Sequence, residues 1–160
     1  MSTSTSKKIV VYRFDRKPVR GFVNPQAWLT SGGLEVLTPA GAIVSIPYAD
    51  VKAACFVKEF DGSGWNAERR LFVSRPKTEG LWVRALFRDA DYIEGILPND
   101  LLPFEPYGYL LAPPDAASNN QRVFLPRAAL SEFRVMGVVG SPARRAKPRL
   151  DPRKQINLFE

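Results

Sequence analysis

The side chains that enzymes use most often for catalysis are scarce in this sequence. It contains no histidine, the commonest general base and metal ligand, and a single cysteine, Cys55. A zinc site built from thiolates and imidazoles is therefore excluded within one chain. The carboxylates form no cluster with the spacing of a magnesium or calcium site, and no phosphate-binding glycine loop is present. The sequence thus predicts no metal, no cofactor and no enzymatic activity.

A polar cluster at residues 118–122, Ser-Asn-Asn-Gln-Arg, is the best candidate for a ligand loop. The amides of Asn119 and Asn120 could hydrogen-bond a ligand or a base edge, with Arg122 as the anchor. Arg127 follows closely and could add a contact to a phosphate. The alternative is a structural turn, because asparagine tolerates a positive φ and bonds its own backbone.

The three tryptophans are candidates for contacts with a partner. Trp65 lies in a glycine-rich loop, so we expect an exposed aromatic contact there. Trp82 lies on a predicted strand, where it would cover the seam between the two halves of the chain. For each tryptophan, including Trp28, the alternative is simple packing.

The C-terminal residues 141–160 are rich in proline and arginine and predict a disordered linker. The last residues differ, because they are apolar and terminal. Gln155, Ile156, Leu158 and Phe159 resemble the short peptide by which bacterial proteins bind the replication sliding clamp, which implies a recognition peptide for a protein partner. The alternative is that Leu158 and Phe159 dock on this protein's own surface.

The net charge of +7 is unevenly distributed. Residues 1–80 carry +5, residues 81–140 carry −2 and residues 141–160 carry +4. Basic tails attract nucleic acid, but the acidic second half argues against a basic groove on the folded part. There is no run of about 18 apolar residues and no signal peptide, and one cysteine suits a reducing compartment. We therefore expect a cytoplasmic protein that does not span a membrane.

Short runs of β-branched and aromatic residues, separated by turn residues, predict an all-β fold. In the first half they are residues 9–14, 19–23, 34–38, 42–46 and 53–57, with one 3₁₀ turn at 47–51. In the second half, residues 81–97 form a strand, a turn and a strand, and residues 107–112 and 121–125 follow before a last strand around Phe133. Residues 68–74 are either an extra strand or a bridging segment.

The second half repeats the order of the first. Gly95 matches Gly21, each inside a strand at a point where a small barrel needs a sharp bend. Segment 126–130 matches segment 47–51. The remaining matches pair Val83, Ala85 and Phe87 with Val10, Tyr12 and Phe14, and Phe133 and Val135 with Ala54 and Phe56.

This repeat predicts two tandem five-stranded Sm-like or SH3-like small barrels, related by internal duplication. The first barrel covers residues 9–60 and the second residues 81–140, with a connecting segment at 61–80. Residues 1–8 and 141–160 are expected to be disordered. The alternative is one larger antiparallel domain whose halves look alike only because strands look alike.

The two halves resemble Sm-like and SH3-like barrels, in which a strand, a polar turn and a glycine-bearing strand open the fold. More closely, the chain resembles an uncharacterised family of bacterial proteins with a paired motif of this kind, over about residues 9–138. That family prefers an Asp-Gly turn, whereas this chain has Asp15-Arg16 and Asp89-Ala90. The resemblance implies a fold and no activity. It rests on residues 56–60, 83–95 and 118–126.

Two functional hypotheses follow from the sequence. The first is a noncatalytic adaptor that binds protein partners through its tandem barrels and its C-terminal peptide. The second is a nucleic-acid-binding protein that uses the basic tail and barrel loops, with a link to the sliding clamp. The fold alone does not choose between them, and the oligomeric state is not predicted.

Overall fold

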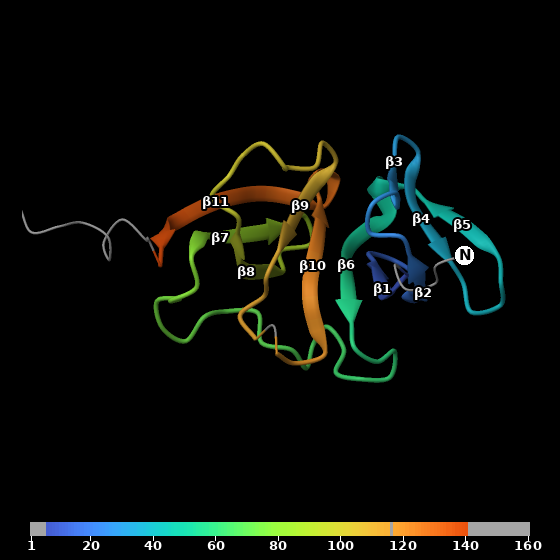
Figure 1. Cartoon of the computed structure of the whole chain (residues 1–160), viewed down its shortest axis with the longest axis horizontal. Coiled ribbons are helices and arrows are strands. Elements are labelled where there is room, and N and C mark those ends of the chain that lie inside the picture. The colour runs from blue at the N-terminus through green and yellow to red at the C-terminus, as the bar shows by residue number, and fades with distance from the viewer. Residues whose placement is uncertain (1–5, 116, 141–160) are drawn as a thin grey trace, which may run out of the picture.

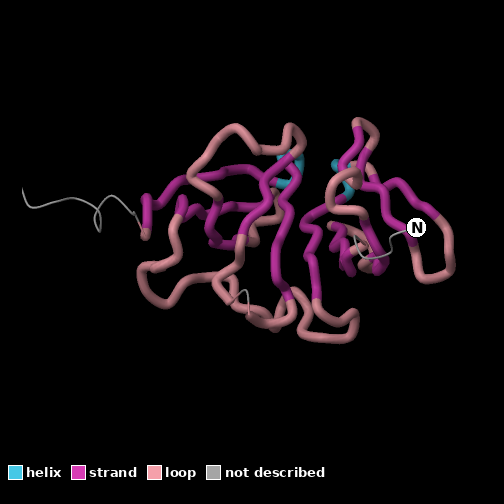
Figure 2. The backbone as a smooth tube through the Cα atoms, viewed as in Figure 1, coloured by secondary structure: helices cyan, strands magenta, loops and turns pink. Residues whose placement is uncertain are grey.

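The computed structural model describes residues 6–115 and 117–140, which form strands joined by loops and two single turns of 3₁₀ helix (Figure 2). The all-β class predicted from the sequence is confirmed, and both 3₁₀ turns lie where they were predicted. In chain order the elements are β1 (Lys7–Arg13), β2 (Val19–Val23), β3 (Leu29–Thr30), β4 (Gly33–Leu37), β5 (Ile43–Ile46), η2 (Tyr48–Asp50), β6 (Val51–Val57), β7 (Gly80–Phe87), β8 (Tyr92–Leu97), β9 (Gly108–Leu111), β10 (Asn120–Pro126), η3 (Arg127–Ala129) and β11 (Leu130–Val139).

The strands of the described residues form two antiparallel sheets. The larger sheet has the order β3-β4-β2-β1-β6-β10-β9, with β5 paired to β4, and it curls around the first half of the chain (Figure 1). The smaller sheet has the order β11-β7-β8. A bridge between Ile96 and Ala112 connects β8 to the segment that follows β9.

A ladder between β6 and β10 joins the two halves of the molecule. Figure 1 shows these strands side by side at its centre, although they are far apart in the sequence. The sequence predicts two barrels separated by a connecting segment and gives no sign of this pairing. The register of the ladder places Phe56, Cys55 and Ala54 opposite Arg122, Val123 and Phe124.

Two buried clusters lie on opposite faces of strands β1 and β6. Ile9 and Val11 point into core one, whereas Val10 points into core two, because successive side chains alternate between faces. Core one also contains Val23, Trp28, Leu34, Val36, Ile46, Val51, Ala54 and Phe124. Core two also contains Ala53, Cys55, Val57, Trp65, Val83, Ala85, Phe87, Ile93, Leu97, Leu111, Val123, Leu125 and Ala129.

The pairing register corrects one match between the halves. Gly21 lies opposite Ile9 and Gly95 lies opposite Val83, so Val83 corresponds in position to Ile9 and not to Val10. The predicted match was wrong by one residue, which exchanges the two faces of a strand. Because β1 is covered on both faces, its apolar residues do not alternate with polar ones, and the pattern could not show which face points inward.

Gly21 and Gly95 lie inside β2 and β8, where a neighbouring segment crosses closely. A Cβ added to Gly21 would lie 2.5 Å from the carbonyl oxygen of Leu37. A Cβ added to Gly95 would lie 2.5 Å from Leu111 Cδ1 and 2.9 Å from the carbonyl oxygen of Ala112. All three distances are shorter than van der Waals contact, so each strand favours a residue without a side chain at this point.

The hairpin between β7 and β8 turns tightly through Asp89 and Ala90. The N–H of Phe87 donates to Asp91 O at 2.7 Å, and the N–H of Ala90 donates to Phe87 O at 2.9 Å. Ala90 has a φ of 72°, in the left-handed region where a Cβ is crowded by the backbone. The turn therefore forms with alanine at a position that favours glycine.

We expect Ala90→Gly to stabilise the protein by about 0.5–1 kcal/mol. Relief of the left-handed strain contributes about 1–2 kcal/mol, and the greater freedom of glycine in the unfolded chain offsets part of it. Equilibrium denaturation in urea measures the difference. A variant that is less stable than the wild type would contradict the strain at this turn.

Candidate functional site

A groove lies on the outward face of the three-stranded sheet. Residues directly opposite each other in antiparallel strands share a face. The register places Glu132 of β11, Leu86 of β7 and Tyr92 of β8 in one row. The next row contains Arg134, Arg84 and Glu94 in the same strand order.

Residues 70–73 lie beside β8, and Leu71 forms one side of this groove. The N–H of Glu94 donates to Arg70 O at 2.7 Å, and the N–H of Phe72 donates to Glu94 Oε1 at 2.9 Å. These bonds place Leu71 beside the sheet. Of the two alternatives for residues 68–74, the structure has the bridging segment and not an extra strand.

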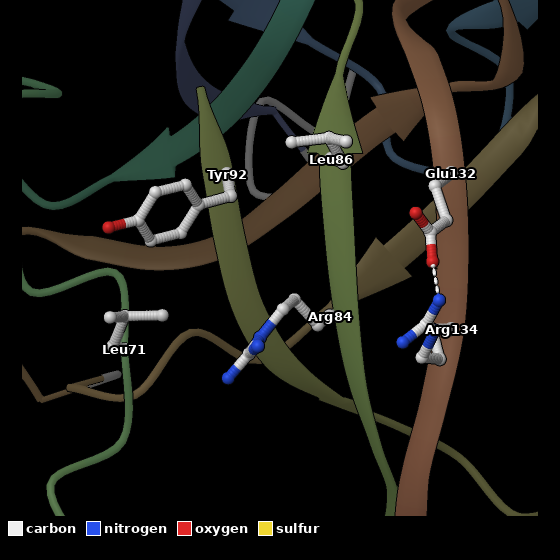
Figure 3. A pocket seen from close by; sticks show the side chains of 6 residues that line it. All are labelled: Leu71, Arg84, Leu86, Tyr92, Glu132 and Arg134. Atoms are coloured by element: carbon white, nitrogen blue, oxygen red, sulfur yellow. Dashed lines mark ion pairs between the residues drawn. The ribbon is translucent and has the colours of Figure 1, made fainter. Parts of the chain in front are cut away.

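The groove has a volume of about 360 Å³. Figure 3 shows Leu71 and Tyr92 on one side, the pair Glu132–Arg134 on the other, and Arg84 and Leu86 on the strand between them. Tyr92 is 45% exposed and Leu71 is 36% exposed, so both can contact a bound molecule. The lining comprises Leu71, Arg84, Leu86, Tyr92, Glu132 and Arg134.

Each guanidinium in the groove has its own carboxylate. Arg84 donates from Nε at 2.9 Å and from Nη2 at 2.6 Å to Oε2 of Glu94, which is only 2% exposed. Arg134 forms an ion pair with Glu132. The charges cancel, and both guanidinium groups, which line the groove, retain further N–H donors.

This lining suits binding better than bond cleavage. Two guanidiniums offer hydrogen bonds to a carbonyl or carboxylate, while Leu71 and Leu86 offer apolar contact. Because the local charge is balanced, the groove does not favour a polyanion such as a nucleic-acid backbone. The arrangement fits a segment with alternating apolar and polar groups.

The predicted ligand loop is bound by the protein itself. Asn119 accepts the N–H of Glu59 on Oδ1 at 2.9 Å and donates from Nδ2 to Ser63 O at 3.3 Å. Asn120 is 3% exposed, and its N–H donates to Glu68 Oε1 at 3.1 Å. Both asparagines therefore attach the start of β10 to segment 59–68, through long-range hydrogen bonds rather than the local turn that was the alternative.

Arg122 and Arg127 lie near β9 instead. Arg122 is exposed and lines a second cavity of about 220 Å³, together with Tyr109 and Phe104. The Arg127 guanidinium lies 5.3 Å from the centre of the Tyr109 ring. The two arginines thus contact the residues around β9, whereas the two asparagines bind segment 59–68.

Trp65 is buried, so the expectation of an exposed aromatic contact was wrong. It is 8% exposed, and its ring lies 5.8 Å from Tyr12 and 5.6 Å from Phe87, measured between centroids. Its indole N–H donates to Asp91 Oδ2 at 2.9 Å. The glycine-rich loop folds back so that Trp65 packs between Tyr12 of β1 and Phe87 of β7. Burying the indole there stabilises the fold more than exposing it to water would.

A cluster of ionic side chains around Asp91 was not predicted from the sequence. Lys52 donates to Asp91 Oδ2 at 2.8 Å and to Asp89 Oδ2 at 2.8 Å, and Arg70 forms a further ion pair with Asp91. Burial alone would raise the pKa of Asp91, but hydrogen bonds from Lys52 and Trp65 outweigh it and lower the pKa to about 2. The cluster links β6, segment 61–79 and the β7–β8 turn, and no spacing in the sequence indicates it.

The terminal peptide of Gln155, Ile156, Leu158 and Phe159 lies outside the described residues, and its recognition role stays a prediction. Cys55 is fully buried, which raises the pKa of its thiol far above the usual range and keeps it unreactive. Among residues 6–115 and 117–140 there is no helix long and apolar enough to cross a membrane. The same residues contain no group of three or more cysteines or acidic side chains that could hold a metal ion.

Comparison with known proteins assigns a family and no activity. A family model described as "Family of unknown function (DUF6982)" matches residues 5–137. No curated protein and no solved structure gives a match.

Proposed function

Because the chain belongs to this family of unknown function, we propose from its own geometry that it is a noncatalytic binding module for protein partners. The observation that carries the proposal is the groove on the outward face of β7, β8 and β11. Its two guanidiniums and two leucines would bind a short extended segment with an apolar side chain next to a carboxylate or carbonyl.

The charges of the groove favour a protein ligand over nucleic acid. Arg84 and Arg134 are each neutralised by a carboxylate, and residues 81–140 carry a net charge of −2. Affinity for nucleic acid rests on uncompensated lysine and arginine that release counterions from phosphates. A protein segment needs only local hydrogen bonds and apolar contact.

We further propose that the two halves are tandem small barrels related by duplication. The first half has the strand order β6-β1-β2-β4-β5, and the second half has β11-β7-β8 followed by β9-β10, with a single bridge from β8 to the residue after β9 (Figure 1). Two further positions support the idea, because the glycines that begin β4 and β9 approach the end of the following strand in the same way. A Cβ on Gly33 would clash with the carbonyl oxygen of Ile46, and one on Gly108 would clash with that of Leu125.

The groove is tested by selecting peptides from a random displayed library on the wild-type chain and measuring their affinity by fluorescence anisotropy. We expect the double variant Leu71→Asp/Arg134→Glu to lose roughly tenfold or more in affinity, about 1.4 kcal/mol. The matched control is Leu102→Asp/Arg16→Glu, which makes the same changes at exposed positions outside the groove. Its affinity should stay within about twofold of wild type.

Two outcomes would contradict this function. Peptides that bind the groove variant as tightly as the wild type would place the contact elsewhere. A library that yields no peptide, together with binding of duplex or single-stranded DNA that weakens steeply with salt, would favour the nucleic-acid hypothesis instead.

A further inference from the structure

Strands β6 and β10 pair with each other, and each has a counterpart strand elsewhere in the molecule that lacks such a partner among the described residues. Ile9 of β1 lies opposite Gly21 of β2 and Phe56 of β6. Val83 of β7 lies in the same way opposite Gly95 of β8 and Val135 of β11. By position, β11 is therefore the counterpart of β6.

The counterpart of β10 is β5. Pro126 ends β10 and leads into η3, as Pro47 follows β5 and leads into η2. Counting back from these prolines, Ile43 occupies the position that Arg122 holds in the internal ladder. Val44 and Ser45 occupy the positions of Val123 and Phe124.

Both counterpart strands have a free edge in the part of the chain that the structure describes. β11 pairs only with β7, and β5 pairs only with β4. Figure 1 places the two strands at opposite ends of the molecule. Unpaired edge strands expose N–H and C=O groups that can pair with another chain.

These free edges also carry exposed apolar side chains. Ile43 of β5 is 75% exposed, and Val135 of β11 is 56% exposed. Val138 and Met136, near the end of β11, are exposed as well. In the internal ladder the corresponding region is closed, with Phe124 fully buried against Trp28 at a centroid distance of 5.3 Å.

We propose that β11 of one chain pairs with β5 of a second copy, antiparallel and head to tail, in the register of the β6–β10 ladder. That register places Val135 opposite Ile43, so the two exposed side chains cover each other. It also places Arg134 opposite Val44 and Phe133 opposite Ser45. The surface is the strand edge, and it adjoins the groove on the sheet's face, because Arg134 of β11 also lines that groove.

The charge distribution supports the head-to-tail orientation, and the side chains at the contact determine how strongly the two copies associate. Residues 1–80 carry +5 and residues 81–140 carry −2, so head-to-tail contact brings opposite charges together. Ser45 stands where the internal ladder has Phe124, so the contact lacks an aromatic anchor and is weaker than the internal one. Each added copy leaves one β5 edge and one β11 edge of the assembly unpaired. The assembly therefore grows until its last copy pairs with its first to form a ring.

The test uses two full-length variants, Ile43→Lys and Val135→Lys, in sedimentation velocity over about two orders of magnitude in concentration. Lysine blocks an edge by charge and is tolerated at exposed strand positions. We expect the wild type to assemble with rising concentration and each variant to remain monomeric. A mixture of the two should form a one-to-one dimer, because each variant retains the edge that the other lacks.

The matched control is Leu102→Lys, which replaces a 93% exposed leucine in the loop between β8 and β9, outside both edges, and should assemble like the wild type. Melting temperatures establish that the variants are folded, and threonine at either position repeats the test if a lysine variant melts early. A wild type that stays monomeric throughout would overturn the proposal. So would self-assembly of the Ile43→Lys variant alone, which would mean that β11 pairs with β11.

Discussion

Replacing Asp91 by alanine should lower the free energy of unfolding by about 2–3 kcal/mol at neutral pH. The carboxylate accepts hydrogen bonds from Lys52 and Trp65 at 2.8 and 2.9 Å and forms an ion pair with Arg70. Removing it leaves Arg70 without its carboxylate and Lys52 with Asp89 alone, and both cations are partly buried, so the loss exceeds that of the bonds themselves. Urea denaturation measures the loss.

The pH dependence of stability gives an independent measure of the same carboxylate. The pKa of Asp91 falls from 3.8 in the unfolded chain to about 2 in the folded protein. Because its pKa is lower in the folded state, ionised Asp91 stabilises the folded protein at any pH above the unfolded pKa. This contribution is lost as the pH falls from about 4 to about 2. Asp91→Asn should therefore show less acid destabilisation than the wild type over that range.

The exposed Asp61→Ala is the matched control and should change stability by no more than about 0.5 kcal/mol. A double-mutant cycle of Asp91→Ala with Lys52→Ala should show coupling, because the two side chains are in direct contact. If Asp91→Ala were as stable as the wild type, the cluster would contribute nothing to the junction of β6, segment 61–79 and the β7–β8 turn.

Gly21→Val should destabilise the protein by about 3 kcal/mol or more. The new Cβ would lie 2.5 Å from the carbonyl oxygen of Leu37 and 2.5 Å from Val36 Cγ1. Leu37 cannot withdraw easily, because it is paired with Phe22 on one side and Ile43 on the other. Overpacking against a fixed backbone is among the most destabilising single changes.

The order of effects among three glycines makes this prediction specific. Gly95→Val should cost less, about 1–3 kcal/mol, because its new Cβ lies 2.9 Å from the nearest backbone atom, Ala112 O, and its closer contact is the end of a movable leucine side chain. Gly32→Val is the control, since its Cβ would meet only Thr30 Oγ1 at 4.0 Å. Thermal and urea unfolding of the three variants measure the order, and equal effects at Gly21 and Gly32 would refute the close approach of β4.

Much of the local structure could be predicted because it depends on neighbours in the sequence. The β-branched run 19–23 coincides with β2, and the segments 47–51 and 126–130 contain η2 and η3. Proline fixes its own φ and interrupts a strand whatever surrounds it. The absence of histidine likewise limits the chemistry of the chain, whatever fold the chain adopts.

The candidate groove could be predicted only in part. Residues 68–74 were recognised as a bridge or a strand, but the pairing of Arg84 with Glu94 needs the β7–β8 register. Arg134 joins them from β11, far along the chain. Asn119 and Asn120 attracted attention as polar loop residues, yet the amide of Asn119 forms internal hydrogen bonds and Asn120 is buried.

The sequence by itself therefore determined the all-β class, most of the strands and the two 3₁₀ turns, through periodicity and the fixed geometry of proline, but not the short strand β3. The tertiary structure decided which faces are buried and which strands meet. Val10 and Ile9 are both buried because core two covers the face of β1 that core one leaves open. Likewise Trp65 reaches Asp91, and β6 pairs with β10, only when the two halves are folded together. Such contacts join residues that are far apart in the sequence, so no local sequence pattern predicts them.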